Sequence, residues 1–117
     1  MPKTLGREDI LQALDCPIDS IHVPEWGGIV HFRAMSGAER DRFDAEVLAA
    51  RETGRSLPGR AELASRVLCD ESGARLFTKD DVEALGAKSG VALDRVVARA
   101  MKAGLMGDIG VEAATGN

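Results

Sequence analysis

Apolar and polar side chains alternate in two short runs between residues 18 and 35, separated by the sequence Pro-Glu-Trp-Gly-Gly. Alternation of this kind is typical of strands with one buried face. The apolar positions are Ile21 and Val23 in the first run, and Val30 and Phe32 in the second. A two-residue turn at Trp26-Gly27 pairs Ile21 with Phe32 and Val23 with Val30, so that all four share one face. The pattern predicts an antiparallel β-hairpin whose apolar face packs on helices.

The rest of the chain repeats apolar residues at helical spacing and predicts about five helices. Their expected ranges are 4–14 or 6–14 for the first, and 37–53, 60–69, 78–86 and 89–104 for the others. Ser36 and Glu39 form a capping box at the start of the second helix, Thr78 is the N-cap of the fourth, and the last helix begins at Ser89. A brief extended segment is expected at 74–77, before the fourth helix.

Each predicted helix has an apolar face, and the last helix has the widest. Its stripe consists of Val91, Leu93, Val96, Val97, Ala100 and Met101. This width predicts a central position for that helix. The second and third helices are expected to bury Phe43, Val47, Leu48 and Ala50, and Leu63, Val67 and Leu68. The first helix, with Ile10, Leu11 and Leu14, is too short to be stable alone and is therefore expected to dock on the rest of the chain.

These elements predict an α+β fold that is mostly α: a small bundle of about five helices with one N-terminal two-stranded antiparallel hairpin. The length of 117 residues suits a single domain, which we expect at residues 1–104. Residues 105–117 contain three glycines and little periodicity, which predicts a flexible C-terminal tail. The alternative is a docking segment that uses Leu105, Met106, Ile109 and Val111.

Charge and cysteine content narrow the class of protein. The net charge is −4 and the pI about 5.1, without the basic stripe of a nucleic-acid binder. No apolar run is long enough for a signal peptide or a membrane span, so we expect a cytoplasmic protein that binds no membrane. Cys16 and Cys69 are expected to be two buried free thiols, because nothing in their spacing indicates a disulfide framework.

The sequence lacks the motifs of common catalytic and cofactor sites, so we expect no enzyme, no cofactor and no metal. The register above places His22 opposite His31, where two imidazoles could chelate a metal. Two ligands without further Cys, Asp or Glu make a poor site, and partly exposed strand histidines are the preferred interpretation. Trp26 has two interpretations: its ring folds back over the hairpin or a helix, or it is an exposed anchor for a partner.

Two blocks of the sequence resemble the tail assembly chaperones of long-tailed bacteriophages, siphovirus-like and myovirus-like, and of related defective prophages. The first is VPEWGGIVHFRAMSGAERDRF, from Val23 to Phe43, with its tryptophan-glycine turn and capped helix. The second is LFTKDDVEALGAKSGVALDRV, from Leu76 onward, with its Leu-Phe-Thr start and final helix. The stretch CDESGARLF fits as the turn that leads into the second block.

The resemblance implies a non-enzymatic protein that binds the tape-measure protein, aids tail-tube assembly and acts in the bacterial host cytoplasm. The tail-tube protein is a further partner in this interpretation, and self-association into a homo-oligomer is left open. Our hypothesis for the partner-binding surface is Trp26 together with Val97 and Met101 on the last helix. The alternatives are a structural tail or connector component retained in the virion, and a small nucleic-acid-associated regulator.

Overall fold

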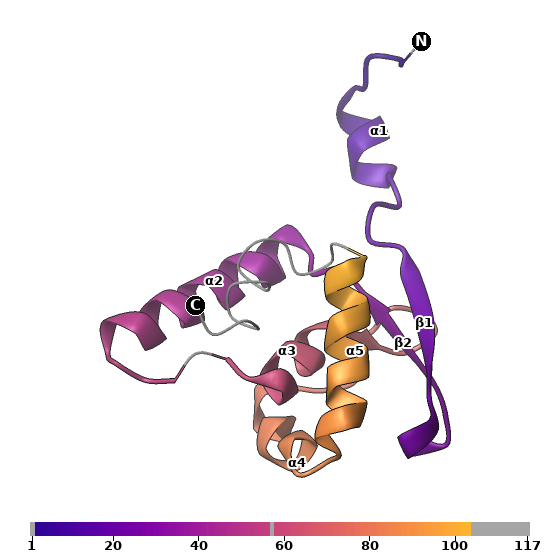
Figure 1. The fold of residues 1–117 in the computed structure, drawn as a ribbon. Helices are drawn as coiled ribbons and strands as arrows, with labels where there is room; N and C mark the ends of the chain where they lie inside the picture. Colours follow the sequence, from indigo (N-terminus) through magenta and orange to yellow (C-terminus); the bar gives the residue numbers. More distant parts are fainter. Residues whose placement is uncertain (1, 57, 104–117) are drawn as a thin grey trace.

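The computed structural model describes residues 2–56 and 58–103. Within them the chain forms five α-helices, two short 3₁₀ helices and three strands (Figure 1). In chain order the elements are α1 (Arg7–Gln12), β1 (Ile18–Val23), η1 (Pro24–Trp26), β2 (Gly28–Arg33), α2 (Gly37–Glu52), α3 (Arg60–Val67), β3 (Leu68–Cys69), η2 (Lys79–Asp81), α4 (Val82–Gly86) and α5 (Gly90–Lys102). The predicted fold class, α+β and mostly α, is confirmed. The predicted tail at 105–117 lies outside the described residues, and the domain boundary at 104 stays a prediction.

The hairpin forms in the predicted place, but its register is shifted by two residues. Ile21 pairs with Val30, and Val23 pairs with Gly28. The predicted two-residue turn is wrong because η1 and Gly27, with a φ of 74°, make a longer connection between the strands. A shift of two residues keeps every side chain on its predicted face, so the apolar side is preserved. It also separates the two histidines, because His22 now lies opposite Ile29.

A third strand, β3, pairs antiparallel with β2 and completes a sheet of order β1-β2-β3. The sequence pattern assigned Leu68 and Cys69 to the end of the third helix. The structure places them in β3, because the backbone becomes extended at Leu68, with ψ of 135°. Both residues are buried, which explains why a helical apolar pattern ran through them. Helix and buried strand cannot be distinguished by periodicity over two residues.

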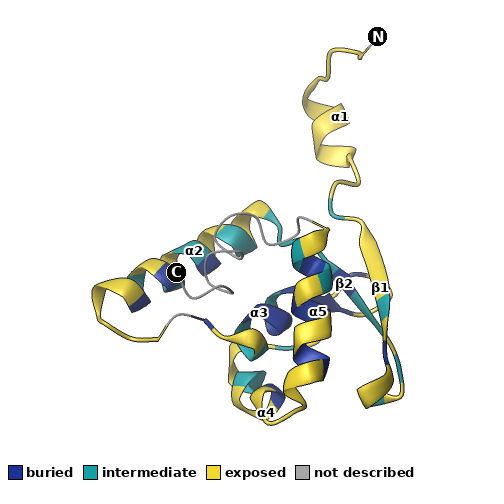
Figure 2. Ribbon diagram, viewed as in Figure 1, coloured by how far each residue is buried: buried dark blue, intermediate teal, exposed yellow. Residues whose placement is uncertain are grey.

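The core lies between the inner face of the hairpin and the helices α3, α4 and α5 (Figure 2). Val23 and Phe32 from the sheet are fully buried there. Leu63 and Val67 from α3 have at most 1% of their surface exposed. The helix α5 contributes Ala92, Leu93, Val96, Val97 and Ala100. Its predicted central position is therefore confirmed for this stripe, except that Val91 lies exposed in the first turn.

The helix α2 buries a narrower face than predicted. Phe43, Val47 and Ala50 are buried, whereas Leu48 is 57% exposed. The three buried positions follow the helical repeat, and Leu48 is rotated about 100° from Val47, toward solvent. The capping box is confirmed, since Ser36 Oγ accepts from the Glu39 backbone N–H and the Glu39 carboxylate accepts from the Ser36 backbone N–H.

The helix α1 stands away from the rest of the molecule beyond the start of β1 (Figure 1). None of its residues is buried, and Leu14, just after it, is 97% exposed. The prediction that this helix docks on the rest of the chain is wrong for the described structure. The helix ends at Ala13, where the backbone becomes extended with ψ of 135°, and a bend at Cys16 precedes β1.

Candidate partner-binding site

Trp26 ends the 3₁₀ turn between the two hairpin strands, and its ring packs partly against the core. The side chain is half-buried. Its indole Nε1–H is fully buried and has no hydrogen-bond acceptor among the described residues. A buried donor without an acceptor is uncommon, because it loses its hydrogen bonds to water without replacement. The ring of Trp26 therefore folds back on the body of the protein and leaves its N–H without an acceptor within the described structure. The interpretation of Trp26 as an anchor for a partner stays a hypothesis.

Beside Trp26 lies a hollow of about 420 Å³ that we call the Trp26 groove. Its wall combines the hairpin turn with the segment from Phe77 to Lys88, and the lining residues are Trp26, Phe77, Asp81, Ala84, Leu85 and Lys88. Four of these six are apolar. The Asp81 carboxylate is already engaged, because it accepts from the backbone N–H and the hydroxyl of Thr78. The groove therefore offers an apolar floor and one uncommitted cation, Lys88, at its edge.

Two ion pairs join the hairpin to α5, one at the start of β1 and one at the turn. Glu25 accepts two hydrogen bonds from Arg95 Nε, at 2.9 and 3.1 Å, and Arg99 pairs with Asp19 at 3.0 Å. The bond from Arg95 lowers the pKa of the exposed Glu25 carboxyl. Because Asp19 is at the start of β1 and Glu25 is in the turn, the two pairs fix both ends of the strand along the helix.

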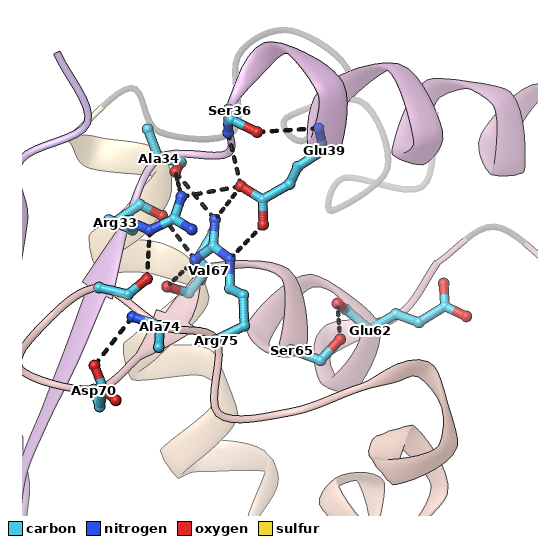
Figure 3. A network of polar contacts seen from close by, with 11 residues as sticks. Arg33, Ala34, Ser36, Glu39, Glu62, Ser65, Val67, Asp70, Ala74 and Arg75 are labelled. Carbon is cyan, nitrogen blue, oxygen red and sulfur yellow. Dashed lines mark hydrogen bonds and ion pairs between the residues drawn. The ribbon is translucent and has the colours of Figure 1, made fainter. Parts of the chain in front are cut away.

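A second cluster joins the end of β2, the start of α2 and the segment after β3 (Figure 3). Glu39 is its centre, and its side chain is only 19% exposed. Arg75 donates to both carboxylate oxygens at 2.7 and 3.0 Å, and Arg33 donates to one at 3.0 Å. These bonds, that from Arg75 above all, hold the pKa of Glu39 well below its usual range. We call these three residues the Glu39 cluster.

Arg75 also binds backbone carbonyls, which ties the cluster to three elements. It donates to the carbonyl oxygens of Val67 at 2.9 Å and Ala34 at 3.1 Å. Arg33 donates through Nε to the carbonyl of Gly73 at 2.7 Å. Gly73 has a φ of 92°, and a Cβ there would lie 3.2 Å from Ile18 Cδ1, so this turn requires glycine. The charged groups of this cluster are satisfied within the chain, which assigns it a structural role.

A family model described as phage tail assembly chaperone matches residues 17–115, which is most of the chain. This chain belongs to the phage tail assembly chaperone family. Among solved structures it is similar to the tail assembly chaperone of bacteriophage HK97, with 25% identity and a TM-score of 0.54. That match covers 86% of this chain and 93% of the HK97 chain. A comparison with curated protein sequences finds no match.

In this tail assembly chaperone the three residues of the predicted partner surface do not form one patch. Trp26 lines the groove, whereas Val97 is 6% exposed and belongs to the core. Met101 is half-buried near the other end of the hairpin, since it follows the ion pair between Arg99 and Asp19. The structure instead brings Trp26 together with Phe77 and Leu85. The sequence pattern carries no signal that these two residues meet the turn.

The described residues hold neither a cluster suited to a metal ion nor a helix that could span a membrane. They contain no group of three His, Cys, Asp or Glu side chains suited to hold a metal ion. No helix among them has the length and apolar character needed to cross a membrane. Cys16 and Cys69 are both free, and only Cys69 is buried. Burial raises the pKa of the Cys69 thiol.

Proposed function

We propose that this chain is a non-enzymatic assembly factor that binds the tape-measure protein, keeps it soluble and aids assembly of the tail tube in the bacterial host cytoplasm. The family match over residues 17–115 supports the general role in tail assembly. The observation that supports a binding role for a specific place is the Trp26 groove, which exposes apolar side chains beside a buried donor without an acceptor.

The groove has the chemistry of a site for an apolar helix or segment. Large rings at the centre of an interface supply much of its binding energy, and Trp is enriched among such residues. A partner that inserts an apolar side chain between Trp26 and Phe77, which are both half-buried, would remove more of their rings from water. Because this N–H is buried, a carbonyl of the same partner would reach it only after the indole ring turns toward the groove, and that rotation is part of the proposal. Met101 is a second contact in this proposal, and Val97 supports it from the core.

Co-expression with the tape-measure protein tests the proposal, with the soluble fraction of that protein as the readout. We expect Ala84→Glu to reduce the soluble fraction several-fold, because it places a charge in the groove from an exposed helix position. Ala98→Glu is the matched control, since Ala98 is an exposed alanine on α5 and does not line the groove. Equal solubility with both variants would contradict the proposed surface.

The same preparation distinguishes an assembly factor from a component retained in the virion. An assembly factor leaves before the tail is complete, so we expect the chain to be absent from purified particles that contain the tape-measure protein. Its presence there in stoichiometric amount would favour the structural alternative. Both proteins must be followed in the same particles, by quantitative mass spectrometry.

A further inference from the structure

A second hollow, of about 170 Å³, lies between α2, α3 and the segment that leads into η2. We call it the basic hollow, because four basic side chains and one carboxylate line it. The basic residues are Arg42, Arg66, Arg75 and Lys79, and the carboxylate is that of Glu39. The protein as a whole carries a net charge of −4, so this hollow has the opposite sign to the average surface.

Two of the four basic side chains are committed to partners within the chain. Arg75 is bound to Glu39 and to backbone carbonyls, as described above. Arg66 pairs with Glu46 and lies over the ring of Phe43, 5.8 Å from its centroid. These contacts leave both guanidinium groups in place as fixed charges in the wall of the hollow.

Arg42 and Lys79 are different, because their side chains are exposed and form no hydrogen bond or ion pair with any described residue. Lys79 also lines a neighbouring hollow together with Glu46 and Glu62, without pairing with either. They approach the hollow from α2 and from η2, so they are not neighbours in sequence. A concave site lined by one sign of charge focuses its field and attracts the opposite charge. The excess of positive charge is therefore available to a ligand rather than neutralised by the protein.

We propose that the basic hollow binds carboxylate groups of an acidic segment on a partner protein. A long nucleic acid is disfavoured, because the cations occupy one small hollow rather than a stripe and the remaining surface is acidic on average. Carboxylates are the natural partners of Arg and Lys side chains that still have free donors. The ligand would pair with Arg42 and Lys79, because Arg66 and Arg75 already have carboxylate partners within the chain.

The inference goes beyond the proposed function, because the basic hollow is separate from the Trp26 groove. Phe77 lines both hollows, so the two are neighbours along the segment before η2. A partner segment that crosses Phe77 would meet an apolar site on one side and a cationic site on the other. Binding of acidic groups can nevertheless be measured without the tape-measure protein, so failure of one proposal does not imply failure of the other.

Fluorescence anisotropy with the full chain and a labelled peptide rich in Glu and Asp tests this inference. The same peptide with Gln and Asn replacing the acids is the uncharged probe. We expect the acidic peptide to bind more tightly than the uncharged probe. Its affinity should fall as the salt concentration rises. The double variant Arg42→Glu/Lys79→Glu is expected to weaken binding at least about tenfold, because it replaces attraction by repulsion at both free cations.

The matched control is Arg7→Glu/Lys102→Glu, which changes the net charge equally at two exposed positions outside the hollow. It is expected to retain most of the affinity. Circular dichroism verifies that both double variants fold. Three results would overturn the inference: equal binding of the two peptides, equal weakening by the two double variants, or tighter binding of duplex DNA than of the acidic peptide.

Discussion

The Glu39 cluster and the Trp26 groove differ in whether their buried polar groups are hydrogen-bonded. In the cluster, each carboxylate oxygen of Glu39 accepts at least one hydrogen bond from an arginine, and Arg75 satisfies two carbonyls as well. In the groove, the indole N–H of Trp26 is buried and has no acceptor among the described residues. Both regions belong to the blocks of sequence that resemble the family. The difference separates a cluster whose polar groups serve the fold from a residue that we propose as a partner contact.

The physical basis of this distinction is the cost of leaving a buried polar group without a hydrogen bond, about 1–3 kcal/mol. A chain that satisfies one site so fully and leaves another unsatisfied loses stability at the second. Binding of a partner that supplies an acceptor would recover that free energy. The comparison therefore predicts that polar substitutions in the two regions have opposite consequences for stability and binding.

The largest expected effect is that of Glu39→Gln. The substitution removes the charge that Arg33 and Arg75 share and leaves two guanidinium groups without their counter-ion. Hydrogen bonds to charged groups are each worth about 1.5–3 kcal/mol, so we expect the free energy of unfolding to fall by about 2–3 kcal/mol. Urea unfolding followed by circular dichroism measures it. Glu52→Gln, at the exposed end of α2, is the control and should change stability by less than about 0.5 kcal/mol.

The pH dependence of stability is the second prediction from the same cluster. The folded-state pKa of Glu39 lies below the usual value of about 4.3 in an unfolded chain. The carboxylate therefore stabilises the fold fully above that value, and this contribution is lost as the pH falls through the folded-state pKa. We expect the destabilisation by Glu39→Gln to be constant near neutral pH and to shrink below about pH 4. A difference that stays unchanged in acid would show that Glu39 is not the group responsible.

How far the sequence could predict this structure depends on the range of the contacts. The capping box of Ser36 and Glu39 is local and was predicted, but the pairing of Glu39 with Arg75 joins positions 36 residues apart. The strand faces were predicted because they depend on a period of two. The register was not, because it depended on whether the chain turned in two residues or through a 3₁₀ turn.

The candidate site shows the same division. Trp26 could be named from the sequence because it is the only tryptophan and occupies a glycine-rich turn. Phe77 and Leu85 could not be assigned to the same groove, because no pattern in the sequence reports which element meets the turn. Val97 was included in the predicted surface because the apolar stripe of the last helix is wide. The width of a stripe does not show how much of it packs in the core, and Val97 is buried there. The prediction for α1 was wrong in the opposite direction, because its short apolar face was expected to pack on the chain and is exposed.

The smallest expected change in stability is that of Trp26→Phe, and it provides the most direct contrast with Glu39→Gln. Phenylalanine keeps an aromatic ring in the turn but removes the N–H group. The loss of buried ring area lowers stability at about 25 cal/mol per Å², whereas removal of the unsatisfied donor raises it by about 1–3 kcal/mol. We expect the two effects to offset each other, with a net change within about 1 kcal/mol in urea unfolding.

Binding should respond differently from stability in the same variant. If a partner supplies an acceptor to the indole N–H, Trp26→Phe loses that hydrogen bond, and less tape-measure protein should remain soluble in co-expression. A loss of about 2 kcal/mol or more in folding stability would instead mean that the N–H already has an acceptor in the folded chain. The contrast between the groove and the cluster would then disappear, because both would be sites in which the polar groups serve the fold.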